Sequence, residues 1–102
     1  MANAARGDVT LTVDGAPRTL RLTLGALAEI ETGLGLERFE EIGPRLSAPS
    51  AADLVVVLGA LLRGAGEPIT DEKLRAAEID LGQAAKAIAA AFGAGEETPG
   101  KS

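Results

Sequence analysis

Residues 20–35, LRLTLGALAEIETGLG, change from the pattern of a β-strand to that of an α-helix. The first leucines alternate with polar residues, which is the period of a strand, and the later apolar residues follow helical spacing. The predicted apolar stripe of this helix is Leu24, Leu27, Ile30 and Leu34. Thr23 lies at the change, where a helix N-cap is expected. Gly33 and Gly35 suit a C-terminus, so the helix is predicted to end near Thr32.

A β-hairpin is predicted immediately before this helix. Residues 8–14 and residues 18–23 each alternate between apolar and polar side chains. The segment Gly15-Ala16-Pro17 between them is typical of a turn, and Pro17 cannot donate a hydrogen bond to a neighbouring strand.

The sequence leaves the register of this hairpin open between two alternatives. A two-residue loop, Gly15-Ala16, pairs Leu11 with Leu20, whereas a four-residue loop pairs Leu11 with Leu22. Both registers place the aliphatic side chains on one face of the hairpin, because they differ by an even number of residues.

A second, short helix is predicted for residues 36–42, with Leu36 and Phe39 pointing inward. Gly43-Pro44 is predicted to stop it, and residues 45–49 are predicted to form a loop. The outward side chains are then the carboxylates of Glu37, Glu40 and Glu41. These carboxylates could bind a cation weakly, but a solvated face or an acidic contact patch for a basic partner is the favoured interpretation.

The strongest helix pattern is residues 50–63, in which Asp53 forms a variant of the capping box with Ser50. This helix is apolar almost all round, which predicts a central position. Two further helices are predicted after caps at Thr70 and Asp80, and the last, alanine-rich one is predicted to end at Phe92-Gly93.

These elements predict an α+β fold, with an N-terminal β-hairpin followed by four or five short helices in one small domain. The domain is predicted to span residues 8–93. Residues 1–7 are predicted to be a flexible N-terminus. Residues 94–102 carry no apolar pattern and are predicted to be a disordered tail.

The composition argues against an enzyme. The chain has no Cys and no His, which removes thiolate ligands and the commonest general base. Glu29 and Glu31 stand two residues apart on a helix, so they point in different directions and do not make an acid–base pair. The segment Gly33-Leu34-Gly35 lacks the third glycine of a phosphate-binding loop and follows a helix rather than a strand. We therefore expect no catalytic residue, no metal site and no cofactor.

The charge and the length of the apolar runs indicate where the chain acts. A net charge of −5 disfavours direct binding to nucleic acid, which needs clustered Lys and Arg. The longest apolar run, residues 54–62, is less than half of the ~20 residues that a membrane span needs. The first residues lack the apolar segment of a signal peptide. The chain is therefore expected to be cytoplasmic, with no membrane contact.

The helices contain more apolar residues than one stripe requires. Residues 55–57 widen the leucine stripe of the central helix, and residues 84–91 are mostly small. Such residues either complete the core or leave an apolar groove for a partner helix, or a face for self-association. The hypothesised contact surface joins the outer face of the central helix to the last helix, and its candidate partner-binding residues are Val55, Val56, Ala87 and Ala91.

Four blocks of the chain resemble a known family of tail proteins. They are RGDVTLTVDG (6–15), LTLGALAEIE (22–31), SAADLVVVLGALLRGAGEPIT (50–70) and AAAFG (89–93). Each block alone is ordinary, but their order and combination cover nearly the whole chain. They are similar to the small tail-assembly proteins of gene transfer agents and tailed phages, which are akin to tail assembly chaperones.

This resemblance implies a non-enzymatic role in the assembly of a phage-like tail. Members of the family are thought to bind the long helical tape-measure protein and keep it soluble, and to help recruit tail tube subunits. The resemblance therefore implies a tape-measure protein as partner, with the tail tube protein as a second. The alternative is a structural tail component, such as a tail tube or connector-associated subunit, that is retained in the particle.

Overall fold

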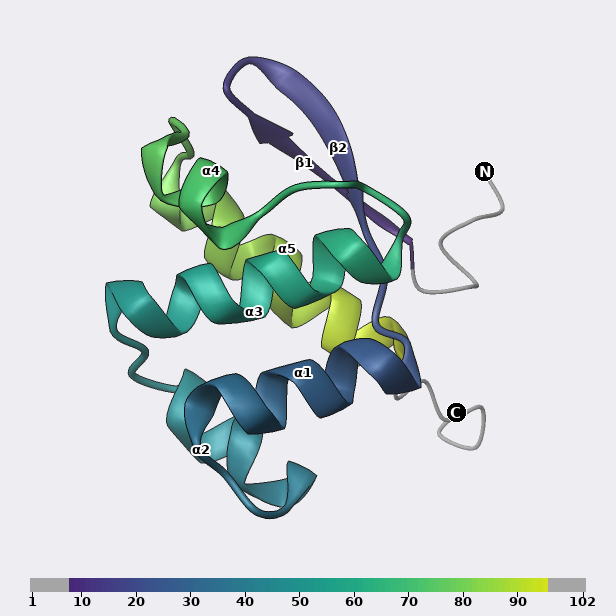
Figure 1. Ribbon diagram of the computed structural model, residues 1–102, viewed down its shortest axis with the longest axis vertical. Coiled ribbons are helices and arrows are strands. Elements are labelled where there is room, and N and C mark those ends of the chain that lie inside the picture. The colour runs from purple at the N-terminus through teal and green to yellow at the C-terminus, as the bar shows by residue number, and fades with distance from the viewer. Residues whose placement is uncertain (1–7, 96–102) are drawn as a thin grey trace.

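The computed structural model describes residues 8–95, which form a β-hairpin followed by helices (Figure 1). The elements are β1 (Val9–Val13), β2 (Ala16–Leu20), α1 (Leu24–Leu34), the 3₁₀ turn η2 (Phe39–Glu41), α2 (Ile42–Leu46), α3 (Ala51–Gly64), α4 (Asp71–Ala76) and α5 (Leu81–Gly95). The predicted α+β class, with an N-terminal hairpin and short helices in one small domain, is confirmed. The flexible N-terminus predicted for residues 1–7 and most of the predicted disordered tail lie outside the described residues.

The hairpin has neither of the two predicted registers. Its two-residue loop is Asp14-Gly15, and Val13 pairs with Ala16 while Leu11 pairs with Arg18. Asp14 and Gly15 have φ angles of 56° and 80°. Positive φ at both positions is the geometry of a type I′ turn, which Asp-Gly favours strongly and which matches the twist of the strands. This turn preference overrides the loops that were predicted after Asp14.

The observed register differs from both predicted ones by an even number of residues, so the predicted apolar face is kept. Leu11, Val13 and Leu20 are buried on it. The shift also ends β2 at Leu20, which releases Leu22 from the sheet. Leu22 is therefore available to line a surface between the helices.

Helix α1 begins after its predicted cap and ends at Leu34, two residues beyond the predicted end at Thr32. The Thr23 hydroxyl accepts a hydrogen bond from the Ala26 backbone N–H (3.0 Å). At the other end Gly35 has a φ of 73°, and the N–H of Leu36 donates to the carbonyl of Glu31 (2.8 Å). These are the features of a Schellman C-cap, for which glycine is suited.

The predicted apolar stripe of α1 is wrong at its first position. Leu24 is 83% exposed, and the buried side chains are Ala26, Ile30 and Leu34. The first helical residue follows directly on the capping Thr23, and its side chain points into solvent instead of toward α3. Helical spacing alone does not say which residue of a stripe first reaches the core.

The second predicted helix is displaced along the chain. Residues 39–41 form only the turn η2, and Gly43 and Pro44, which were predicted to stop a helix, lie inside the first turn of α2. Proline is tolerated there because the first backbone N–H groups of a helix have no partner within it. The displacement turns Phe39 outward, so the prediction that Phe39 is buried is wrong: it is 59% exposed.

Helix α3 is the central helix, as predicted (Figure 1). Its capping box is complete, since Ser50 Oγ accepts from the Asp53 N–H and Asp53 Oδ2 accepts from the Ser50 N–H. The second half of α3 is buried on all sides, and its core residues are Val57, Leu58, Ala60, Leu61 and Leu62. The helix packs against α1, β2, α4 and α5, so it contacts most of the other elements of the domain.

Gly64 allows the end of α3 to approach the chain between β2 and α1. A Cβ atom at this position would lie 2.5 Å from the carbonyl oxygen of Arg21. Because that atom belongs to the backbone, we expect Gly64→Ala to lower the free energy of unfolding by about 1–3 kcal/mol, as overpacking does. Gly93 in α5 has open space around it, so Gly93→Ala should be neutral or stabilise by up to ~1 kcal/mol. Urea unfolding of the two variants checks this, and equal effects would contradict the close approach.

The last two helices begin at their predicted caps. The Thr70 hydroxyl accepts from the Lys73 N–H (3.1 Å), and Asp80 Oδ1 accepts from the Gln83 N–H (2.9 Å). Helix α5 extends to Gly95, two residues beyond its predicted end.

Candidate functional site: an apolar groove beside helix α5

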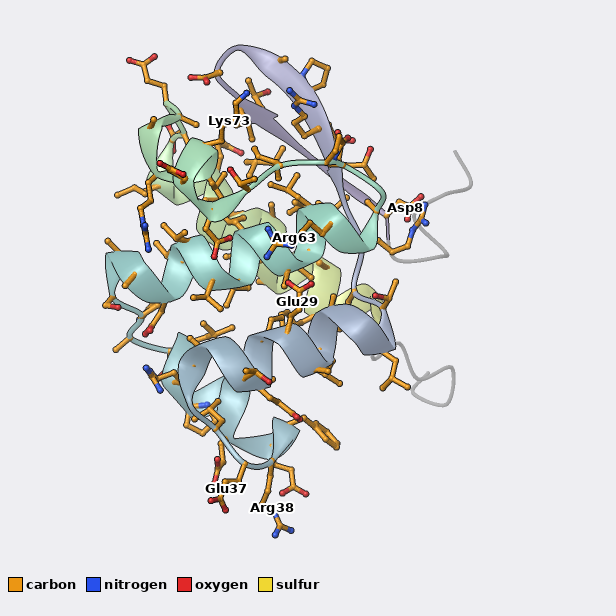
Figure 2. All side chains as sticks on the ribbon, viewed as in Figure 1. Asp8, Glu29, Glu37, Arg38, Arg63 and Lys73 are labelled. Atoms are coloured by element: carbon orange, nitrogen blue, oxygen red, sulfur yellow. The ribbon has the colours of Figure 1, made fainter. Side chains whose placement is uncertain are left out.

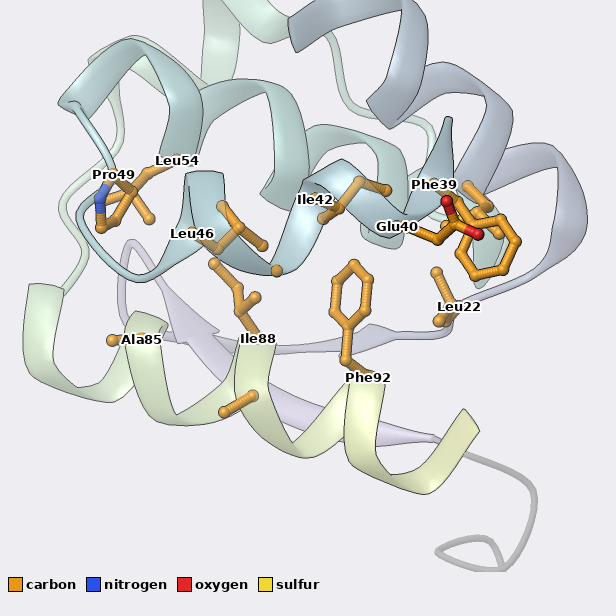
Figure 3. Close-up of a pocket in the computed structure, with 13 residues that line it drawn as sticks. Leu22, Phe39, Glu40, Ile42, Leu46, Pro49, Leu54, Ala85, Ile88 and Phe92 are labelled. Carbon is orange, nitrogen blue, oxygen red and sulfur yellow. The ribbon is translucent and has the colours of Figure 1, made fainter. Parts of the chain in front are cut away.

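An apolar groove of about 570 Å³ lies between α5 and the segment formed by η2 and α2 (Figure 3). Its size is within the ~300–1,000 Å³ of ordinary binding pockets. The α5 wall presents Ala85, Ile88, Ala89 and Phe92, the opposite wall Phe39, Glu40, Ile42, Gly43 and Leu46, and the rest is Leu22, Leu27, Pro49 and Leu54. Glu40 is the one charged residue in this set, so the groove offers a ligand almost exclusively apolar contact.

The groove exists because α5 has two apolar faces. Ala84, Ala87 and Ala91 are buried in the core, and their small side chains let the helix approach β1 closely. On an adjacent face the larger Ile88 and Phe92 point toward α2 (Figure 3). The sheet and α3 therefore hold α5 in place, while its second apolar face, on which Ile88 is buried and Phe92 partly buried, forms a wall of the groove.

The opposite wall is held by one arginine. Arg45 in α2 donates two hydrogen bonds to the carboxylate of Asp53 (both 3.1 Å) and a third to the carbonyl of Leu34 (3.1 Å). These bonds join α2 to the start of α3 and to the end of α1. Ile42 is buried beneath α2 as the main apolar contact. The bidentate geometry fixes orientation as well as distance, so Arg45 positions this wall of the groove.

Acid should weaken the attachment of this wall. The backbone N–H of Ser50, together with the Arg45 guanidinium, lowers the pKa of Asp53 below its usual range. A lowered folded-state pKa adds stability above the unfolded pKa of ~3.9, and this stability is lost as the pH falls through that value toward the folded pKa. We therefore expect Asp53→Asn to flatten the dependence of unfolding free energy on pH between about pH 5 and pH 2. Urea titrations at several pH values measure the slope, and an unchanged slope would contradict this role of Asp53.

Arg63 joins helix α3 to α1 and to the start of α4. Arg63 in α3 donates to Glu29 (2.8 Å), to Asp71 (3.2 Å) and to the carbonyl of Ile69 (2.9 Å), and Figure 2 shows it facing Glu29 across the gap between α1 and α3. The hydrogen bond from Arg63 to Glu29 is the main cause of the raised pKa of Arg63. Glu29 therefore joins α1 to α3.

The carboxylates of Glu40 and Glu41 contact residues close to them in the sequence. Glu40 pairs with Arg38 (3.2 Å), and Glu41 accepts a hydrogen bond from the N–H of Glu37 (3.1 Å). Within residues 8–95 the structure contains no group of three or more acidic, His or Cys side chains arranged to hold a metal ion.

The structure does not bring the four predicted partner-binding residues to one accessible surface. Ala87 and Ala91 are buried in the core. Val55 and Val56 are partly buried, and Val56 lies against Gly33 of α1. The accessible apolar residues of α5 are instead Ala85 and Ala89, which line the groove. Their spacing with Ile88 and Phe92 was visible in the sequence, but nothing in it showed that other elements cover this face only in part.

The groove is apolar and has no convergent polar groups, which is typical of surfaces that receive the apolar face of a helix. A family model described as phage tail tube protein, GTA-gp10, matches residues 6–94, and the chain belongs to this family. The resemblance to tail proteins of gene transfer agents and phages is thereby confirmed at the level of the family. No curated protein and no solved structure matches the chain. Among the described helices, none has the length and apolar character to cross a membrane.

Proposed function

We propose that this chain acts without catalysis in tail assembly, by binding an amphipathic helix of the tape-measure protein in the groove beside α5. The open apolar groove is the observation that carries this proposal. A long helical protein exposes apolar stripes before it is assembled, and a groove that covers part of such a stripe keeps it from aggregating. The net charge of −5 helps to keep the complex in solution.

The groove has dimensions that suit a helix. Its α5 wall runs from Ala85 to Phe92, which is two helical turns or ~10 Å. A partner helix of that length presents apolar side chains at positions i, i+3 or i+4 and i+7. Gly43, Ala85 and Ala89 on the rims are small, so they would let the partner backbone come close.

A second function, favoured by the description of the family, is that of a tail tube subunit retained in the particle. The family description supports this function more directly than it supports a chaperone. In this case the groove would take an apolar segment of the neighbouring subunit or of the tail tube protein. Both functions use the groove for protein binding, and they differ in whether the chain leaves after assembly.

Two measurements on the intact chain separate the two functions. Co-expression with the tape-measure protein encoded alongside it, followed by pull-down and size exclusion, should give a soluble complex under conditions where the tape measure alone is insoluble. Quantitative mass spectrometry of purified particles should then find the chain absent or far below the tail tube protein. No complex, together with stoichiometric amounts in the particles, would replace the chaperone proposal by the tube subunit.

A further inference from the structure

The outer edge of β1 carries backbone groups that the described part of the chain leaves unpaired. In the observed register Val9, Leu11 and Val13 make the hydrogen-bonded pairs with β2, so the N–H and C=O groups of Thr10 and Thr12 point away from β2. No residue in 8–95 forms a hydrogen bond with these groups, and both threonines are exposed. An edge of this kind is a template for another extended chain.

The outer edge of β2, by contrast, offers no free backbone N–H group to another chain. Pro17 has no N–H to offer, and the N–H of Thr19 donates to the carboxylate of Glu67 (3.2 Å). Farther along, the N–H of Arg21 donates to the carbonyl of Leu61 (3.0 Å). Every outward N–H along this edge is therefore absent or occupied. The hairpin is protected on one side and open on the other.

The turn end of β1 is also closed, which limits the open edge to the two threonines. The N–H of Asp14 donates to the carbonyl of Glu78 (2.9 Å), and the N–H of Glu78 donates to Asp14 Oδ1 (2.8 Å). Because the partner of the Asp14 carboxylate is a neutral amide, this carboxylate keeps its negative charge. This end of the open edge is acidic.

We propose that β1 binds an extended segment of another polypeptide by strand addition at Thr10 and Thr12. The segment has an apolar side chain at every second position and a basic residue at the end that lies beside the Asp14 carboxylate. Since α5 packs against β1, apolar side chains on the Leu11 side of the added strand extend the core beneath α5. Alternate side chains give specificity and the backbone hydrogen bonds give affinity.

The charge of Asp14 favours a segment with a basic residue at this end, because opposite charges on paired strands are stabilising. This surface is separate from the groove, so its test does not depend on the function proposed above.

The probe is the peptide acetyl-Lys-Val-Thr-Val-Thr-Val-Lys-amide, added to the isotope-labelled full chain and followed by NMR. Lysine at both ends places a cation beside the Asp14 carboxylate in either strand direction. We expect the amide signals of Thr10 and Thr12 to shift most and their hydrogen exchange to slow. The same peptide with glutamate at both ends should bind more weakly.

Proline variants test the edge itself. Thr10→Pro removes one outward N–H without removing a hydrogen bond of the hairpin, as Pro17 already does on β2, and should weaken peptide binding about two- to tenfold. Thr10→Pro with Thr12→Pro should abolish it, while Thr10→Val, which keeps the N–H, should not weaken it. Circular dichroism verifies folding. Binding that survives both prolines, no binding at millimolar peptide, or self-association through this edge without peptide would each overturn the proposal.

Discussion

An Ala89→Asp variant should fold like the parent chain and lose binding to the tape-measure protein. Ala89 is exposed on α5 and lines the groove, so the new carboxylate meets solvent in the free chain. In the complex it would be buried against an apolar helix with no cation among the groove residues to pair with it. We expect affinity to fall by at least ~100-fold, as measured by calorimetry or by pull-down of the co-expressed partner.

Ala90→Asp is the matched control for this variant. Ala90 is the next residue of the same helix, is also exposed and does not line the groove. The two variants have the same charge and the same helix propensity. Ala90→Asp should therefore bind like the parent chain. Equal affinities of the two variants would place the binding surface elsewhere on the molecule.

Leu61→Ala should lower the free energy of unfolding by about 3–5 kcal/mol, the upper range for a buried leucine. Leu61 is fully buried in the central helix, which packs against α1, β2, α4 and α5. For a domain of this size each 1 kcal/mol shifts the Tm by about 4–8 °C, so the variant will melt far below the parent or fail to fold.

Leu24→Ala supplies the contrast for this second prediction. It removes the same atoms from a leucine that is 83% exposed, and should change stability by no more than ~0.5 kcal/mol. A similar loss in both variants would mean that Leu24 packs against the core, as the spacing in the sequence first predicted.

The hairpin illustrates what the sequence could and could not predict. Alternation identified both strands and their buried face, because a face depends only on whether residue numbers are odd or even. The register depends on the turn, and the preference of Asp14-Gly15 for positive φ at both positions was the signal that the predicted loops overlooked. The helix caps were predicted correctly, because a capping side chain such as Thr23 accepts a hydrogen bond from a backbone N–H only three residues away in the sequence.

The groove could not be predicted, because it depends on how far apart α5 and the η2–α2 segment lie in the folded chain. The spacing of Ile88 and Phe92 identifies an apolar face of α5, but a packed face and an open one have the same pattern in sequence. The outward position of Phe39 follows from the displacement of α2, which begins only after Glu41. Arg45 was assigned to a loop, and its bonds to Asp53 and Leu34 join segments that are separate in the chain.

Methyl NMR of the labelled full chain, with and without the tape-measure protein, tests the central claim most directly. Binding in the groove predicts that the largest shifts occur at Leu22, Ile42, Leu46 and Ile88, while the methyl groups of Val9 and Leu74, which do not line the groove, keep their positions. Shifts centred instead on Val55 and Val56, with the groove methyl groups unchanged, would contradict the account.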